Sequence, residues 1–238
     1  MSTRLALFDI DGTLVTGAAT ERRFALQLAR TGHLGPRQGL AFARQALAGL
    51  PAWGRHTLKK DKAWLAGLDV AQLAALARPW AAALVARAGF APCIARLEHH
   101  RQAGDTVALL SGTPQFLAEV IGRELGVDLV VATLCVARDG RFGAAAPLRH
   151  PFGAEKLELA HALARATGIG LWRCVAYADS GQDLPLLRAV GTAVAGRPRA
   201  APPRGALGTR GAPACSAERS RRAAKADRVG AQAQGDRA

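Results

Sequence analysis

The chain has 238 residues, of which half are apolar and 5% are aromatic, and its formal net charge is +14. This length is enough for one well-buried core together with a smaller lobe or a tail. No apolar stretch reaches the length of a membrane span, and Asp9 interrupts the first apolar run too early for a signal peptide. We therefore expect a cytoplasmic protein without a membrane span.

The positive charge is concentrated near the C-terminus. Residues 197–238 hold ten Lys or Arg and three Asp or Glu, a net +7, which leaves +7 for the other 196 residues. Ala, Arg, Gly and Pro dominate this segment and hydrophobic periodicity is lost, which predicts a disordered basic tail. The tail lacks aromatic interleaving and any recognisable nucleic-acid module, so nucleic acid is not the expected partner. Binding to nucleic acid or to an anionic surface through the tail remains the alternative function.

The first expected element is a short buried strand at residues 5–8, which ends at a pair of carboxylates. Asp9 and Asp11 follow the strand in alternation, and Gly12 and Thr13 supply turn chemistry. Parallel sheets hold their ligands beyond the carboxyl ends of their strands, so this pair indicates a functional site. The alternative is a motif that only closes the strand, because Asp and Gly are ordinary turn residues.

A long helical block follows and continues to about residue 102. Gly, Pro and Asp interrupt its pattern at regular intervals, and it contains no convincing strand. The expected helices are residues 19–30, 36–50, 55–65, 70–86 and 92–102. Such a block after the first strand predicts a helical cap, which we assign to residues 15–102.

From residue 106 onwards, short apolar runs alternate with helical segments. The expected strands are residues 106–110, 129–133, 174–178 and 192–194, the expected helices are residues 115–125, 155–167 and 183–189, and a hairpin turn is expected at residues 138–141. Strands that alternate with helices predict an α/β core with a parallel sheet, formed by residues 1–14 and 103–196.

An anion site is indicated after the second of these strands. Ser111 and Gly112 stand at its end, just before a helix, where a hydroxyl and free backbone N–H groups can bind an anion. The alternative is an ordinary helix cap. Lys156 lies near the start of a later helix, a position that is slightly unfavourable to the helix dipole and is explained if the lysine serves an anion. The alternative is a solvated surface charge, the usual state of a lysine in such a position.

A metal site is indicated after the strand at residues 174–178. Asp179 and Asp183 are four residues apart with a glycine between them, which suits a hard cation such as Mg²⁺. The alternative is one Asp at a strand end and another that caps a helix. The four cysteines have neither zinc nor disulfide spacing, so we expect free thiols in a reducing compartment.

These motifs occur in a fixed order: Asp9 to Thr13, then Ser111, then Lys156, then Asp179 and Asp183. The order resembles the four-motif pattern of the haloacid dehalogenase superfamily. A helical cap directly after the first motif, together with the sequence of residues 176–187, resembles the phosphoserine-phosphatase-like branch (subfamily IB). The resemblance covers about residues 4–195 and implies a Rossmann-like parallel sheet core with a cap inserted after the first strand.

The resemblance also implies an activity, namely Mg²⁺-dependent hydrolysis of a small phosphorylated substrate through an aspartyl-phosphate. Asp9 would be the nucleophile, and Asp11 would protonate the leaving oxygen and then activate water. Mg²⁺ would be held by Asp9, by the backbone carbonyl of Asp11 and by Asp179. Transfer of the phosphoryl group to an acceptor other than water is the alternative use of the same site.

The remaining motif residues would support this chemistry. Ser111, Gly112 and Lys156 would bind the phosphoryl oxygens, while Asp183 would order the site and Thr13 would support it. The sequence gives no indication of the oligomeric state.

One departure from the family pattern bears on the substrate. Phosphoserine phosphatases carry a Glu nine residues after the nucleophile, where it meets the ammonium group, and this chain has Ala18 there. Glu21 is the nearest acid, and Arg22 and Arg23 follow it. These three residues are candidates for substrate binding, although a solvated helix face is the simpler interpretation of the two arginines. Further basic residues of the cap are Lys59, Lys60 and Lys62. We therefore expect weak activity on phosphoserine and better activity on an ester with a neutral or anionic body.

Overall fold

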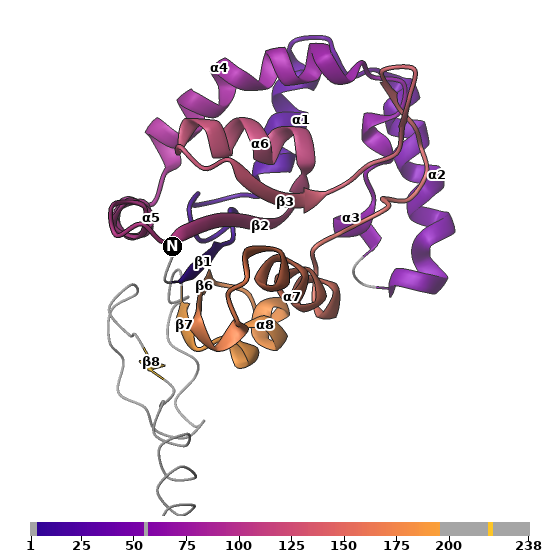
Figure 1. Cartoon of the computed structure of the whole chain (residues 1–238). Helices are drawn as coiled ribbons and strands as arrows, with labels where there is room; N and C mark the ends of the chain where they lie inside the picture. The colour runs from indigo at the N-terminus through magenta and orange to yellow at the C-terminus, as the bar shows by residue number, and fades with distance from the viewer. Residues whose placement is uncertain (1–3, 55–56, 196–218, 221–238) are drawn as a thin grey trace, which may run out of the picture.

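A sheet of six strands forms the centre of the computed structural model, which describes residues 4–54, 57–195 and 219–220 (Figure 1). The strand order is β3-β2-β1-β6-β7-β8, in which the first five strands are parallel and β8 is antiparallel to β7. The strands are β1 (Leu5–Phe8), β2 (Thr106–Pro114), β3 (Leu129–Thr133), β6 (Cys174–Ala178), β7 (Thr192–Ala195) and β8 (Arg219–Ser220). The predicted α/β class with a parallel sheet is confirmed.

Strand β1 is the middle one of the three strands whose carboxyl ends carry predicted site residues. It pairs with β2 on one side and with β6 on the other, and its four side chains are at most 1% exposed. The carboxyl ends of the three strands therefore meet at one edge of the sheet. Asp9 follows β1 there, Ser111 lies in the last part of β2, and Asp179 follows β6.

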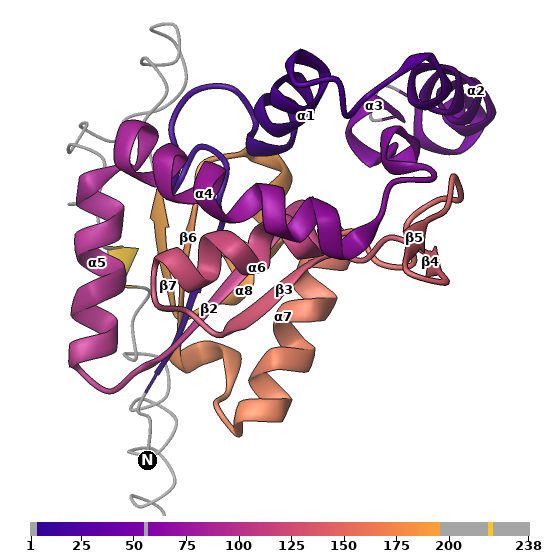
Figure 2. The ribbon, with the colours of Figure 1, turned by 90° about the horizontal axis from the view of Figure 1, so that it is seen from above.

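Helices cover both faces of the sheet, and the alternation of side chains along β1 explains how (Figure 2). Ala6 and Phe8 pack into the core with α5 and α6, whereas Leu5 and Leu7 pack with α7 and α8. These helices are α5 (Ala91–Gln102), α6 (Gln115–Glu124), α7 (Ala154–Thr167) and α8 (Leu184–Ala189), and the short 3₁₀ turns η3 (Leu171–Arg173) and η4 (Gly181–Asp183) flank β6.

The cap consists of helices that lie between β1 and α5 in the chain. They are α1 (Thr20–Arg30), α2 (Pro36–Trp53), α3 (Thr57–Lys60), the 3₁₀ turn η2 (Ala63–Leu65) and α4 (Val70–Ala88). The single helix predicted for residues 55–65 is wrong, because the described part of it divides into α3 and η2. Asp61 explains the break: its Oδ1 accepts a hydrogen bond from the Ala63 N–H at 2.8 Å, which turns the chain.

The chain leaves the core and returns to it at one hinge. Val15 bridges to Gly89, the Phe90 N–H donates to the Leu14 carbonyl at 2.8 Å, and the Thr16 N–H donates to the Ala88 carbonyl at 2.8 Å. Helix α5, directly after the hinge, packs on β1 and β2. We propose that the cap ends near residue 90 and that α5 belongs to the core, in place of the boundary at residue 102.

A hairpin from the core forms a second connection to the cap. Strands β4 (Ala137–Arg138) and β5 (Arg141–Phe142) pair as the turn signal predicts, with positive φ angles at Asp139 and Gly140. The hairpin lies beside the start of α4 (Figure 2). The Val70 N–H donates to the Gly140 carbonyl at 2.8 Å, and the Gly67 N–H donates to the Phe142 carbonyl at 2.7 Å.

Two residues of the expected C-terminal tail are described by the structure. Arg219 and Ser220 pair with Ala193 and Thr192 to form β8, at the outer edge of β7, which offers unpaired backbone groups. The rest of residues 197–238, and with it the tail-dependent alternative function, lies outside the described residues. Over the part of the chain that the structure describes, no helix is long and apolar enough to cross a membrane.

Candidate active site

A buried lysine joins two of the predicted site carboxylates. Lys156, in the first turn of α7, places its Nζ 3.3 Å from Asp9 Oδ1 and 2.7 Å from Asp183 Oδ1. Lys156 and Asp183 are each only 3% exposed. The structure therefore brings together residues from β1, α7 and the segment after β6, which are far apart in the sequence.

The electrostatics of this cluster favour a protonated lysine and disfavour an ionised Asp9. Burial raises the pKa of Asp9 to about 6; Asp183 and Asp11 add to the rise, while Lys156 and a hydrogen bond from Ser111 oppose it. Burial alone would lower the pKa of Lys156, but Asp9 and Asp183 together hold it above its usual value. The ammonium group of Lys156 is thus held in its charged form between the two carboxylates.

Asp11 is fixed by the first residue of the cap. Its Oδ1 accepts hydrogen bonds from the Thr20 N–H, at 2.7 Å, and from the Thr20 hydroxyl. Its Oδ2 lies 3.4 Å from the Thr113 hydroxyl. Thr20 is the start of α1, so the orientation of Asp11 depends on the position of that helix. Sequence reasoning missed Thr20, and its only signal is a hydroxyl at a helix start nine residues after Asp11.

Gly12 allows the third carboxylate to approach the first motif. A Cβ built on Gly12 would lie 2.1 Å from Asp179 Oδ2, and the φ angle of Gly12 is +80°. Only glycine fits both conditions, so Asp179 lies directly against the backbone that follows Asp11. Beside it, the Ser180 hydroxyl donates to Asp183 Oδ2 at 2.7 Å.

The predicted anion-binding residues lie at the end of β2. Ser111 is 1% exposed, and its hydroxyl lies 3.3 Å from the Thr113 hydroxyl. Strand β2 continues through this segment to Pro114, with a shift in its pairing to β3 after Leu110. Thr13, the predicted supporting residue, is fully buried, and its hydroxyl has no hydrogen-bond partner among the described residues.

His150 is a buried neighbour of this segment that sequence reasoning did not identify. The Thr133 hydroxyl donates its single proton to the Gly112 carbonyl at 2.7 Å. His150 Nδ1 lies 2.8 Å from the hydroxyl oxygen of Thr133, which has no second proton to give, so Nδ1 carries a proton and donates it to that oxygen. Burial lowers the pKa of His150 to about 3, and nearby lysines add to the effect, of which Lys62 is the strongest. The ring is therefore neutral, and its Nε2, which has no partner among the described residues, is a hydrogen-bond acceptor.

A hard cation at this site would be bound by side-chain carboxylates together with a backbone carbonyl. Within the described ranges, no three His, Cys, Asp or Glu side chains form a metal-binding cluster. The set expected from the sequence has only two side-chain ligands, Asp9 and Asp179, with the backbone carbonyl of Asp11 as the third. The approach of Asp179 to Gly12 and the raised pKa of Asp9 both fit a site in which a cation balances the carboxylates.

The three predicted substrate-binding residues of the cap lie in different surroundings. Glu21 accepts hydrogen bonds from Lys62 Nζ and, at 2.7 Å, from the Trp64 indole N–H. Arg22 is exposed. An Nη of Arg23 donates to the Thr16 carbonyl at 2.8 Å, which ties this arginine to the hinge.

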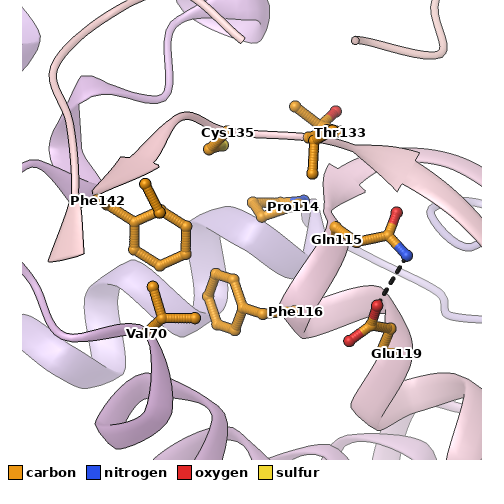
Figure 3. Close-up of a pocket in the computed structure, with 10 residues that line it drawn as sticks. Val70, Pro114, Gln115, Phe116, Glu119, Thr133, Cys135 and Phe142 are labelled. Atoms are coloured by element: carbon orange, nitrogen blue, oxygen red, sulfur yellow. Dashed lines mark hydrogen bonds between the residues drawn. The ribbon is translucent and has the colours of Figure 1, made fainter. Parts of the chain in front are cut away.

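A pocket opens between α4, α6 and the segment after β3, but none of the predicted catalytic residues lines it (Figure 3). Val70, Phe116 and Phe142 form its apolar side, and Gln115 donates to Glu119 at 2.9 Å on the opposite side. Its other lining residues are Pro114, Thr133, Leu134, Cys135 and Ala137. The pocket therefore marks the junction of cap and core.

A parallel sheet that gathers four carboxylates and a buried lysine at one edge, beneath a helical cap, defines a Rossmann-like α/β protein with a capped polar site. The family model described as haloacid dehalogenase-like hydrolase matches residues 6–188. The chain therefore belongs to the haloacid dehalogenase-like hydrolase family, as its motifs indicate.

Curated relatives and solved structures agree with this assignment. The chain is 33% identical over 205 residues to a putative hydrolase of Mycobacterium leprae and 34% identical over 207 residues to phosphoserine phosphatase SerB1 of Mycobacterium tuberculosis. Each alignment covers 83% of this chain and spans about two thirds of the relative, 68% and 66% respectively.

Among solved structures, a protein of unknown function from Bordetella pertussis Tohama I is 28% identical, with a TM-score of 0.67 over 82% of this chain and 90% of that chain. A phospho-aspartyl intermediate analogue of phosphoserine phosphatase is 19% identical, with a TM-score of 0.53 over 82% and 87% of the two chains, and so shares the fold. These comparisons confirm the enzyme class expected from the sequence, a phosphatase of the phosphoserine-phosphatase-like branch.

Proposed function

We propose that the chain is a Mg²⁺-dependent phosphomonoester hydrolase that acts on a small phosphorylated metabolite through an aspartyl-phosphate at Asp9. The observation that carries the proposal is the position of Asp9, at the end of the central strand and within ion-pair distance of buried Lys156. Relatives named as phosphatases support the same conclusion.

The proposed reaction has two steps that share one site. Asp9 attacks phosphorus, so that a bond from its carboxylate oxygen to phosphorus forms as the ester P–O bond breaks. Asp11 donates a proton to the leaving oxygen, then takes a proton from the water that cleaves the aspartyl-phosphate and restores Asp9. Thr20 holds Asp11 during both transfers through the two hydrogen bonds to Oδ1.

Two groups of residues handle the charge of the phosphoryl group. Ser111, the backbone N–H of Gly112 and Lys156 would bind its oxygens as negative charge shifts in the transition state. Asp9, Asp179 and the backbone carbonyl of Asp11 would hold Mg²⁺, which would reduce the repulsion between an anionic nucleophile and an anionic ester. Asp183 keeps Lys156 in place through the 2.7 Å ion pair.

The proposal includes a cytoplasmic location. Cys93 and Cys174 are buried free thiols, which is the state expected of cysteines in a reducing compartment.

A hydrolysis assay with an active-site control tests the proposal. The purified chain should release phosphate from p-nitrophenyl phosphate and from a panel of small monoesters with Mg²⁺, and EDTA should stop the release. Asp9→Asn should be folded and inactive, because the amide removes the attacking charge at almost constant volume. Rapid acid quenching of the wild-type reaction should leave one phosphoryl group on the peptide that contains Asp9. Near-normal turnover by a folded Asp9→Asn protein would overturn the mechanism.

A further inference from the structure

We infer that Lys62 is a specificity-determining residue that occupies Glu21 and thereby excludes substrates whose leaving group carries an ammonium. The inference rests on the proposed phosphatase function and adds a substrate class to it. The favoured monoesters carry a hydroxyl where phosphoserine carries its ammonium group.

Both carboxylate oxygens of Glu21 are already used within the cap. Oε2 is paired with Lys62 Nζ, and Oε1 accepts from the Trp64 indole N–H at 2.7 Å. Lys62 is 3% exposed and the Glu21 side chain is 19% exposed, so the pair is largely shielded from water. A charge-assisted hydrogen bond in such a place is strong, and a substrate ammonium could reach Glu21 only by displacing Lys62.

The pair is connected to the proposed reacting groups through its neighbour in the chain. Thr20, whose backbone and hydroxyl bind Asp11, directly precedes Glu21 in the chain. Because Asp11 protonates the leaving oxygen in the proposed mechanism, the body of the leaving group must lie near this start of α1. On the core side, Lys62 also acts electrostatically on His150, the neighbour of Gly112. Lys62 is therefore paired with the cap acid and is also within electrostatic range of a residue that neighbours the predicted phosphate-binding segment.

The charges around Glu21 and Lys62 favour a substrate with a hydroxyl over one with an ammonium group. Glu21 is neutralised by Lys62, and burial raises the pKa of the neighbouring Asp61, which disfavours its ionised form. Lys60, whose Nζ lies 5.9 Å from the Phe152 ring centroid, adds a second positive charge in the same cap segment. An ammonium group that enters this region loses water and finds Glu21 already paired with Lys62, whereas a hydroxyl has little hydration energy to lose.

The test compares two esters of nearly equal shape. Phosphoserine and 3-phosphoglycerate share the carboxylate and the phosphate and differ by an ammonium in place of a hydroxyl. The quantity measured is the ratio of kcat/KM for phosphoserine to kcat/KM for 3-phosphoglycerate. Lys62→Met removes the charge while it keeps most of the length of the side chain, so it should free Glu21 and raise this ratio about tenfold or more.

Matched variants separate this effect from a structural one. Lys62→Arg keeps the cation and should keep the wild-type ratio. Lys60→Met removes a neighbouring cap charge that is not paired with Glu21, so it should raise the ratio far less than Lys62→Met does. Glu21→Gln should lower the ratio, because Lys62 is then left without its carboxylate partner. The double variant Glu21→Gln/Lys62→Met should lose the gain of Lys62→Met, which only a direct coupling of the two residues explains.

The outcomes are distinguishable from a failure of the proposed function. If wild type hydrolyses neither p-nitrophenyl phosphate nor any other monoester, the phosphatase proposal fails. If wild type is active but Lys62→Met leaves the ratio unchanged, or if wild type prefers phosphoserine, the role of Lys62 is wrong while the phosphatase proposal stands. If Lys62→Met does not fold, Glu21→Gln decides, and an unchanged ratio in that variant overturns the inference.

Discussion

Asp9→Asn should stabilise the metal-free protein even though it destroys the proposed nucleophile. Asp9 has a pKa raised from 3.8 to about 6, chiefly by burial, so ionising it in the folded state costs about 3 kcal/mol more than in the unfolded chain. Asn is neutral at every pH and avoids this cost. At pH 8 without metal, the free energy of unfolding should therefore rise by up to about 3 kcal/mol, or about 6–12 °C in Tm.

The stability gained by Asp9→Asn should depend on pH in a defined direction. A raised folded-state pKa means that the contribution of Asp9 is fully present below pH 3.8 and is lost as the pH rises through about 6. The stability difference between Asp9→Asn and wild type should therefore be largest at pH 8 and nearly vanish at pH 4. Mg²⁺ should reverse it, because wild type offers the better cation site and gains stability on binding.

Thermal or urea unfolding in EDTA, and again in excess Mg²⁺, measures all of these quantities. Asp128→Asn is the matched control, because it makes the same chemical change at an exposed carboxylate. It should alter the free energy of unfolding by less than about 0.5 kcal/mol. A metal-free Asp9→Asn protein less stable than wild type at pH 8 would refute the electrostatic reasoning.

Three further variants test the surroundings of the site. Gly12→Ala should weaken Mg²⁺ binding and activity by about a hundredfold or more, because the new Cβ would lie 2.1 Å from a carboxylate oxygen, whereas Gly32→Ala, with nothing within 4 Å, should cost only about 1 kcal/mol of backbone strain. Thr20→Val removes the hydroxyl that binds Asp11, so kcat for alkyl phosphates should fall about tenfold while p-nitrophenyl phosphate, whose leaving group needs no proton, changes little; equal losses would count against the role of Thr20. His150 has a pKa near 3, so its contribution to stability is complete above about pH 6.5 and is lost as the pH falls towards 3. Between pH 6.5 and 5 wild type should thus lose about 2 kcal/mol of unfolding free energy that His150→Gln does not lose, as urea titrations at the two pH values would show.

The parts of the fold that depend on local pattern could be predicted from the sequence. The strand at residues 129–133 has the predicted bounds, because an apolar run between turn residues determines it locally. The gathering of Asp9, Ser111 and Asp179 also follows from sequence, since parallel strands that end in polar residues must place them at one edge. Their roles in catalysis stay predictions.

Contacts across the cap could not be predicted in the same way. Lys62 meets Glu21 over 41 positions of sequence, and that pairing depends on the turn at Asp61, which breaks a segment with the pattern of one helix. The tautomer of His150 depends likewise on Thr133, whose single hydroxyl proton is donated to the backbone carbonyl of Gly112. Both features arise from tertiary packing, which overrides the local signal.

The β4–β5 hairpin bears on how this enzyme could be recombined with its relatives. Residues 67–70 and 140–142 form a continuous backbone ladder that includes the Phe142 N–H donating to the Leu68 carbonyl at 3.0 Å. A chimera that exchanges residues 15–90 alone would cut this ladder and leave its donors and acceptors without matched partners. The exchangeable module is therefore two segments of chain, the cap together with the hairpin that follows β3, and natural variation in the cap should be accompanied by variation in residues 137–142.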